Sequence, residues 1–514
     1  MEPPGKFSIA RSRILDLRKS FSMKCRQERS KNMNRKLSTL ALRLLMLTLV
    51  SCETNAQPKV PEFPFHTAGQ FMVDASGRVV MFHGVNMVNK FSPYTLSAAG
   101  FRDVDAKLIA DAGWNVVRMG VLYSGLEPTA GNYDEAYLDR IEETVDLLGR
   151  HGIFSLLDFH QDLYGTVFSG DGFPPWATQT DGLPLQPSHG FPNDYFELPA
   201  LQRAFDNFWG NSIGPSQIGL QDRYAAAWRH VAKRFASNRW VMGYDLFNEP
   251  FPGSNWKACN YTVGCAQFDQ ILGAFMAKLA QAIAGVDSLH IVFYEPPVLF
   301  GFGIPCNMPS PSGNRIGFSF HNYWPKDSNL PIQNALSHSR KTGAALFMTE
   351  FGASVDPAPV IQVANLADSS LIPWIYWAYA NKTPFKIVTP GLPATPEQQG
   401  IVLDLSKPRE GTNLNSPILK GLARPYPVAI AGTPESFGFD PQTQIFRLKY
   451  RKPDADSSLR NKETVIVLPT SLYPKGYRFE VSGAKVSSPP GAKFLQLLAE
   501  GDQEDISVSI FPNQ

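Results

Sequence analysis

Two glutamates, Glu249 and Glu350, each follow an apolar segment that has the composition of a buried strand. Glycoside hydrolysis requires two such groups, because one carboxyl protonates the leaving oxygen while the other attacks the anomeric carbon. A like-charged neighbour raises the pKa of one member of the pair, which keeps that member protonated. We therefore predict that Glu249 is the acid/base and Glu350 the nucleophile. Retention of configuration follows if the two carboxyl groups lie about 5–5.5 Å apart.

Other predicted strand ends carry polar and aromatic side chains that suit the same reaction. Arg118 is placed to hold Glu350 anionic, and His321 and Tyr323 to orient or donate to the two carboxyl groups. Trp377 offers a flat face to a sugar ring. The predicted binding and supporting residues are Arg118, His160, Asp162, Asn248, His321, Tyr323 and Trp377. No group of ligands has the spacing of a metal site, so no metal or other cofactor is expected.

These residues need a scaffold that brings distant strand ends together. From about residue 63 to 422, short apolar runs alternate with stretches of helical spacing, such as the stripe of Tyr137, Leu138, Ile141, Val145 and Leu148 followed by Gly152. The pattern predicts a (β/α)8 TIM barrel, whose functional side chains gather at the carboxyl ends of the strands. The eight predicted strands are Val79–Asn86, Asn115–Met119, Ile153–Phe159, Val241–Phe247, His290–Tyr294, Ile316–Phe320, Ala345–Thr349 and Trp374–Tyr379.

The pattern changes after Arg424 to short alternating strands, which include 444–450, 464–468 and 477–481. This change predicts a small C-terminal antiparallel β-sandwich. We therefore divide the chain into an N-terminal tail with a signal-like segment (1–56), a TIM-barrel catalytic domain (57–424) and a C-terminal sandwich (425–514). The sandwich is expected to cap the barrel, with docking on membranes as the alternative.

Composition bounds the classes of protein that are compatible with the chain. An apolar content of 43% with 18% charged residues excludes a disordered or collagen-like protein. The net charge is +2, and its positive excess lies in the first fifty residues. The folded part is then slightly acidic, so nucleic acid is not expected as a partner.

The N-terminal segment has the pattern of an export signal. Arg35 and Lys36 precede an apolar run from Leu37 to Val50, which is shorter than the roughly 20 residues that span a bilayer. The sequence that ends at Cys52 is similar to a bacterial lipobox, in which the cysteine is acylated. The alternative is ordinary cleavage nearby, for example after Ala56. We expect a protein that is secreted, or lipid-anchored at the cell surface through Cys52.

Several motifs together resemble glycoside hydrolase family 5 and, more narrowly, its endoglycoceramidases. The family pattern is carried by Arg118, Asn248-Glu249-Pro250, the His321-x-Tyr323 pair and Thr349-Glu350-Phe351-Gly352. The narrower resemblance is carried by the segments 158–164, 172–177, 203–209, 244–251 and 425–434. Glu295 also ends a predicted strand, but we rank it below Glu350 because the fifth strand lacks the family's partner geometry.

The resemblance implies a retaining endo-β-glycosidase that cleaves between the oligosaccharide and the ceramide of glycosphingolipids. It implies a glycosphingolipid substrate, transient contact with a membrane surface and a monomer. The alternatives are a family 5 β-glucanase or glucosylceramidase, or a catalytically silent glycolipid-binding protein. Apolar loop residues favour a groove for lipid, and packing on the barrel is the other interpretation. These residues are Phe168, Phe173, Trp176, Val298, Leu299, Phe300, Phe302 and Ile304.

Two further expectations concern single residues near the predicted site. Cys259 and Cys265 flank a short loop close to Glu249, and export permits a disulfide between them. This loop departs from the pattern expected of bacterial secreted members and leaves the sugar preference open. Lys90 is expected to be a solvated loop lysine, with contact to an outer sugar or an acidic head group as the alternative.

Overall fold

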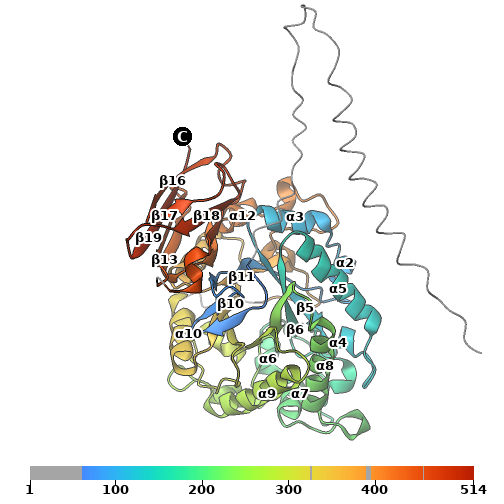
Figure 1. Cartoon of the computed structure of the whole chain (residues 1–514). Coiled ribbons are helices and arrows are strands. Elements are labelled where there is room, and N and C mark those ends of the chain that lie inside the picture. Colours follow the sequence, from blue (N-terminus) through green and yellow to red (C-terminus); the bar gives the residue numbers. More distant parts are fainter. Residues whose placement is uncertain (1–60, 324–326, 389–394, 455, 514) are drawn as a thin grey trace, which may run out of the picture. The chain divides into compact units, whose positions relative to one another are not determined.

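The computed structural model describes residues 61–323, 327–388, 395–454 and 456–513. Eight parallel strands close into a barrel in the order β10-β11-β4-β5-β6-β7-β8-β9, part of which is labelled in Figure 1. The predicted TIM barrel is therefore confirmed. The barrel strands are β4 (His83–Met87), β5 (Val116–Leu122), β6 (Phe154–His160), β7 (Val241–Asp245), β8 (Ile291–Tyr294), β9 (Ile316–Asn322), β10 (Ala345–Phe351) and β11 (Trp374–Ala380).

Helices with one apolar face follow most barrel strands. The helix α5 (Glu135–Arg150) begins after Asp134, whose side chain accepts a hydrogen bond from the backbone N–H of Tyr137. Its predicted stripe is buried, and Gly152 just beyond its end has a φ of 75°, which suits a residue that stops a helix. The other long helices are α3 (Asp103–Asp111), α7 (Pro199–Trp209), α8 (Leu220–Phe235), α9 (Ala266–Ala284), α10 (Asn329–Thr342), α11 (Pro357–Ser369) and α12 (Ser416–Leu422). Among the helices of the described ranges, none has the length and apolar content to cross a bilayer.

The fifth repeat departs from the predicted βα pattern. Between β8 and β9 the chain forms only the short 3-10 helix η5 (Val298–Phe302). This segment contains prolines 296, 297, 305, 309 and 311. Proline lacks the backbone N–H that a helix requires and clashes with the preceding turn, so a full α-helix does not form there.

The first predicted strand, Val79–Asn86, is wrong as a single element. It consists of β3 (Val79–Val80) and the barrel strand β4, and β3 pairs antiparallel with β12 (Tyr426–Ile430) of the C-terminal region. Both pieces are buried, so the apolar run continues across the break without a turn residue. Periodicity alone does not reveal that two halves of such a run pair with different sheets.

The strands of the C-terminal region, orange to red in Figure 1, belong to two antiparallel sheets. One has the order β13-β14-β19-β16, and the other has the order β1-β2-β3-β12-β15-β18-β17. Apolar side chains from both sheets share one buried cluster, which confirms the predicted sandwich. The strands outside the barrel are β1 (His66–Ala68), β2 (Phe71–Val73), β13 (Thr433–Asp440), β14 (Ile445–Arg451), β15 (Thr464–Val467), β16 (Tyr477–Ser482), β17 (Ala484–Val486), β18 (Phe494–Ala499) and β19 (Asp505–Pro512). The sandwich thus takes three strands from the beginning of the described chain.

Candidate active site

The predicted site residues meet at one end of the barrel. Most of them lie near the carboxyl end of a strand or in the loop that follows, whereas Arg118 lies in the first half of β5 and Trp377 at the middle of β11. Arg118 lies on β5, His160 ends β6 with Asp162 just beyond it, Asn248 and Glu249 follow β7, His321 is on β9 with Tyr323 after it, Glu350 is on β10, and Trp377 is on β11. This is the rim where barrel enzymes place their reacting groups.

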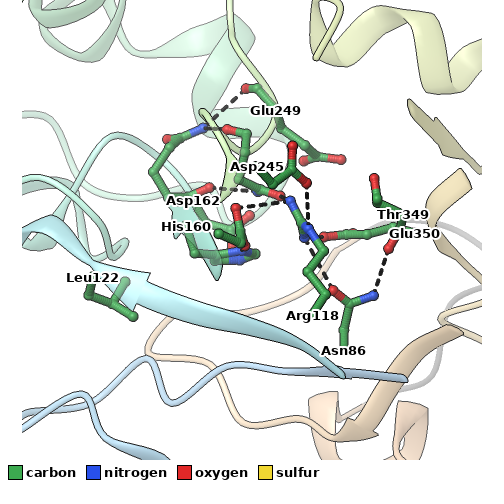
Figure 2. A network of polar contacts seen from close by, with 12 residues as sticks. Asn86, Arg118, Leu122, His160, Asp162, Asp245, Glu249, Thr349 and Glu350 are labelled. Atoms are coloured by element: carbon green, nitrogen blue, oxygen red, sulfur yellow. Dashed lines mark hydrogen bonds and ion pairs between the residues drawn. The ribbon is translucent and has the colours of Figure 1, made fainter. Parts of the chain in front are cut away.

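Arg118 connects several of these strands through its guanidinium group. It donates to Glu350 Oε1 from Nη1 over 2.6 Å, to Asp245 Oδ2 from Nε over 2.8 Å and to Asn248 Oδ1 from Nη2 over 2.9 Å. The side chain is fully buried, and Figure 2 shows it between Asp245, Asn86 and Glu350. The structure therefore contains the predicted hydrogen bond between Arg118 and Glu350. A buried guanidinium held by several acceptors fixes the geometry of the carboxylates around it.

Glu350 accepts hydrogen bonds at both of its carboxylate oxygens. Arg118 donates to Oε1, and the Tyr323 hydroxyl donates to Oε2 over 2.9 Å. Burial raises the pKa of Glu350, while the nearby His321 and Arg118 oppose that rise. Donors aimed at both oxygens favour the carboxylate form that a nucleophile requires.

Glu249 lies in a less charge-compensated environment. Its Oε1 is 2.9 Å from His321 Nδ1, and its side chain is almost completely buried. Burial, reinforced by the negative charge of Asp162, raises the pKa of Glu249 to about 8. Burial also lowers the pKa of His321 to about 4, so the imidazole is neutral at pH 7. A protonated Glu249 beside a neutral imidazole is suited to general acid catalysis at neutral pH.

The two glutamates lie close enough for the geometry of a retaining enzyme. One carboxylate oxygen of Glu249 and one of Glu350 lie within 4.8 Å of each other, with a ring nitrogen of His321 between them. Inverting enzymes separate the two carboxyl groups by about 6.5–9.5 Å to make room for a water molecule. The short separation therefore supports direct attack by one glutamate.

His160 and Asp162 form a second polar group next to the glutamates. His160 Nδ1 is 2.7 Å from Asp158, and its Nε2 is 3.3 Å from Asp162. Burial lowers the pKa of His160, but the charge of Asp158 and the hydrogen bonds to Asp158 and Asp162 together outweigh burial and raise this pKa to about 9. Trp377 lies parallel to His160 with ring centroids 5.5 Å apart. His160, Asp162 and Trp377, three of the predicted binding residues, are therefore neighbours.

Lys90 belongs to this second group, and the expectation of a solvated lysine is wrong. Lys90 is buried, forms an ion pair with Asp162, and lies 3.8 Å from Asp171 and 4.8 Å from the Trp377 ring. Asp171 lies in the long insertion after β6, and no sequence feature marked it. The only signal for Lys90 was its place just after a strand, because its partners come from a different part of the chain.

Two groups in the described residues have donors close enough to hold a metal ion. They are His160, Asp162 and Asp171, and Glu249, His321 and Glu350. Lys90 already supplies a positive charge to the aspartates of the first group. The second group consists of the predicted reacting glutamates and their shared histidine. The expectation that the protein uses no metal ion therefore stays a prediction.

Four of the eight apolar loop residues that favoured a lipid groove are buried, and the other four, Phe302 among them, are half-buried. Phe168, Phe173, Leu299 and Phe300 are buried in the main hydrophobic core. Trp176, Val298 and Ile304 are half-buried and pack against the same core. For the four buried residues the interpretation as a groove is wrong, and packing on the barrel explains their apolar character.

Cys259 and Cys265 form a disulfide in the structure. It closes the loop between η4 (Gly253–Ala258) and α9, a short distance along the chain from Glu249. The signal-like segment with Cys52 lies outside the described residues.

Comparison with known families agrees with this geometry. The model "Cellulase (glycosyl hydrolase family 5)" matches residues 73–383, and the model "Glycoside hydrolase family 5 C-terminal domain" matches residues 424–510. Endoglycoceramidase I of Rhodococcus hoagii (strain 103S) is 30% identical over 473 residues, which cover 86% of this chain and 87% of the relative. An endoglycoceramidase of Cyanea nozakii is 30% identical over 445 residues, 79% of this chain and 84% of the relative.

Solved structures of endo-glycoceramidase II from Rhodococcus sp. are also similar. Its complex with a five-membered iminocyclitol superposes with a TM-score of 0.68 at 27% identity and covers 86% of this chain and 99% of that one. Its lactosyl-enzyme intermediate superposes with a TM-score of 0.66 at 27% identity over the same shares. Barrel, sandwich and polar rim residues thus occur together in a chain that belongs to glycoside hydrolase family 5.

Proposed function

We propose that the protein is a retaining endoglycoceramidase, which hydrolyses the bond between the oligosaccharide and the ceramide of glycosphingolipids. The observation that carries the proposal is the pair of buried glutamates with carboxylate oxygens within 4.8 Å of each other. Relatives that cover most of the chain are endoglycoceramidases, and one similar structure is a complex of such an enzyme with ganglioside GM3.

The reaction proceeds in two displacements. Protonated Glu249 gives its proton to the glycosidic oxygen while Glu350 attacks the anomeric carbon, so ceramide leaves and a glycosyl ester forms on Glu350. Glu249, now a carboxylate, takes a proton from water, and the water oxygen attacks the anomeric carbon and releases Glu350. Two inversions at one carbon give net retention. The capture of a lactosyl-enzyme intermediate in a similar structure supports this course.

The supporting residues have distinct proposed roles. Arg118 and Tyr323 hold Glu350 as a carboxylate, because each donates to one of its oxygens. Asn248, fixed by Arg118 and by the backbone oxygen of Gln161, is placed to bind the sugar hydroxyl next to the anomeric carbon. His160, Asp162 and Trp377, which lie next to one another, bind the glycan.

The product released from two substrates distinguishes this function from its alternatives. The purified protein is incubated separately with ganglioside GM1 and with glucosylceramide, and released glycans are identified by mass spectrometry. An intact oligosaccharide from GM1 supports the proposal. Release of only single hexoses indicates a glucosylceramidase, and binding without any product indicates a silent glycolipid-binding protein.

We also propose that the protein is exported and acts as a monomer in transient contact with a membrane surface. The basic and apolar pattern of residues 35–50 supports export, and the lipobox-like Cys52 supports a lipid anchor as one form of it. Mass spectrometry of the mature N-terminus from the native host tests this proposal. An N-terminus at Met1 contradicts it.

A further inference from the structure

The backbone of Glu249 adopts a conformation that residues other than glycine rarely take. Its φ is 48°, in the left-handed region where the side chain crowds the backbone. Such a conformation persists only where the surroundings hold it in place. The position of the acid/base carboxyl therefore depends on contacts that restrain the backbone of Glu249.

Two side chains provide these restraints, one on each side of Glu249. The backbone N–H of Glu249 donates to Glu295 Oε1 over 3.0 Å. The amide of Gln161 donates to the Glu249 carbonyl oxygen over 3.1 Å. Gln161 also donates to the Asn248 carbonyl oxygen over 2.9 Å. The peptide groups on both sides of the Glu249 α-carbon are thus fixed by hydrogen bonds.

Glu295 is itself held rigidly in this position. It follows β8 directly, its side chain is buried, and Pro296 and Pro297 come next. Backbone hydrogen bonds join this segment to the Glu249 loop on both sides, from Leu246 N–H to the Phe293 oxygen and from Val298 N–H to the Pro250 oxygen, each over 3.0 Å. The carboxyl group of Glu295 therefore has little freedom to leave the Glu249 amide.

The same carboxyl group also faces the histidine that contacts Glu249. Glu295 Oε1 is 3.5 Å from His321 Nε2, and Oε2 is 3.7 Å from Arg118 Nη2. Within the described residues, His321 Nε2 has no hydrogen-bond partner, and the Glu295 carboxyl faces it without forming a hydrogen bond. A proton on Nε2 facing Glu295 leaves Nδ1 free to accept from the protonated carboxyl of Glu249. In histidine generally, the group that faces one ring nitrogen decides which of the two nitrogens carries the proton.

We propose that Glu295 is a positioning residue for the acid/base: it holds the left-handed backbone of Glu249 through the amide N–H and directs the tautomer of His321. Glu295 does not touch the reacting atoms in this assignment. The inference rests on the proposed function of Glu249. It explains why a carboxylate from the fifth strand is buried beside the catalytic pair although it carries out no step of the reaction.

The dependence of the reaction on its leaving group separates this role from a general structural one. A ceramide alcohol is a poor leaving group and requires protonation, whereas 2,4-dinitrophenolate leaves without help from an acid. A misplaced Glu249 should therefore slow cleavage of a glycosphingolipid and spare the first step with 2,4-dinitrophenyl β-lactoside. The ratio of the two kcat/KM values, measured on one preparation, does not depend on the fraction of folded enzyme.

Two variants of Glu295 test the hydrogen bond itself. Glu295→Leu removes the acceptor at similar size, and we expect kcat/KM for lactosyl ceramide or GM1 to fall about 100-fold, as for a displaced catalytic group, with less than about a threefold fall for the dinitrophenyl lactoside. Glu295→Gln keeps an oxygen that accepts from the Glu249 amide, so it should recover most of the loss. Equal losses on both substrates, or equal defects in the two variants, overturn the proposal.

A matched control is available elsewhere in the barrel. Glu127 is also buried, accepts the backbone N–H of Gly131 and faces Arg223 at 3.2 Å. Glu127→Leu should leave the ratio of the two kcat/KM values unchanged. If this variant also changes the ratio, the effect of Glu295 is not specific and the proposal is overturned. Failure of the wild-type enzyme to hydrolyse either substrate refutes the proposed function instead.

Discussion

The Tyr323 hydroxyl donates a hydrogen bond to Glu350 Oε2 over 2.9 Å. With Arg118 on the other oxygen, Glu350 has a donor at each of its two carboxylate oxygens. Among the residues that the structure describes, the only hydrogen-bond partner of the Glu249 carboxyl is the ring nitrogen of His321. The asymmetry in donors supports Glu350 as the nucleophile and Glu249 as the acid/base without reference to any relative, because donors favour an ionised carboxylate and burial without donors favours a protonated one.

Removal of the Tyr323 hydroxyl should weaken catalysis without removing it. A hydrogen bond to a charged group contributes about 1.5–3 kcal/mol, so we expect Tyr323→Phe to lower kcat/KM by about ten- to a hundredfold. The acid limb of the pH profile should move to higher pH, because Glu350 loses a donor that favours its ionised form. Tyr473→Phe, which removes a hydroxyl that donates to the Gln444 backbone, serves as the control. An unchanged acid limb contradicts this role.

Glu350→Gln should abolish turnover while glycolipid binding is retained. Loss of a nucleophile lowers kcat by about four orders of magnitude or more, and the amide is close in size to the carboxyl. Turnover of GM1 is measured by product mass, and binding by calorimetry with the oligosaccharide. Near-normal turnover by this variant would refute the assignment of the nucleophile.

Azide should partly rescue Glu249→Ala. A small anion can take the place of the water that Glu249 activates in the second step, and it attacks the glycosyl-enzyme without a general base. With a dinitrophenyl β-lactoside as substrate, we expect azide to raise kcat and to yield a β-glycosyl azide. An α-glycosyl azide in the proton NMR spectrum, or the same response in Glu350→Ala, contradicts the two-step scheme.

The alkaline limb of the pH profile should report Glu249. Because burial raises its pKa to about 8, the acid form is present at pH 7 and is lost as the pH rises through that value. For a glycosphingolipid, kcat/KM should therefore fall about tenfold per pH unit well above pH 8. For a dinitrophenyl glycoside the alkaline fall should be much weaker, since the first step then needs no acid. If the alkaline fall in kcat/KM were the same for the two substrates, loss of the Glu249 proton would be excluded as its cause.

The sequence was sufficient to predict the barrel and the polar residues at the ends of its strands, because both depend on local patterns. Strands such as β6 and β10 are apolar runs that end in polar residues, and this pattern locates His160 and Glu350 at strand ends. The order of strands around a parallel barrel follows from chain order, so distant strand ends meet at one rim. The proximity of Arg118 to Glu350 follows from these facts.

Contacts made by long loops could not be predicted in the same way. Lys90 is buried because Asp171, from the insertion after β6, approaches it, and nothing in the local sequence of either residue indicates the other. The division of Val79–Asn86 between two sheets depends on β12, which lies far along the chain. Such features are set by tertiary packing, which overrides local periodicity.

Tyr426 offers a test of whether the sandwich stabilises the barrel. Its ring stacks on His83 of β4 with centroids 3.8 Å apart, and its hydroxyl donates to the Gly113 oxygen over 2.9 Å. All nine tryptophans lie between Trp114 and Trp377, so tryptophan fluorescence reports the barrel alone. Loss of a buried large aromatic side chain costs about 3–5 kcal/mol, so Tyr426→Ala should move the fluorescence transition to clearly lower denaturant.

The control for this experiment is Phe479→Ala, which alters a partly exposed ring on β16 of the sheet β13-β14-β19-β16. This change should shift the transition by much less, because little apolar surface is lost from the interior. A barrel transition that stays unchanged in Tyr426→Ala would mean that the two regions unfold independently. A shared shift in tryptophan fluorescence and in enzyme activity would mean that the sandwich, through β3 and β12, is part of the structure that holds the catalytic rim in place.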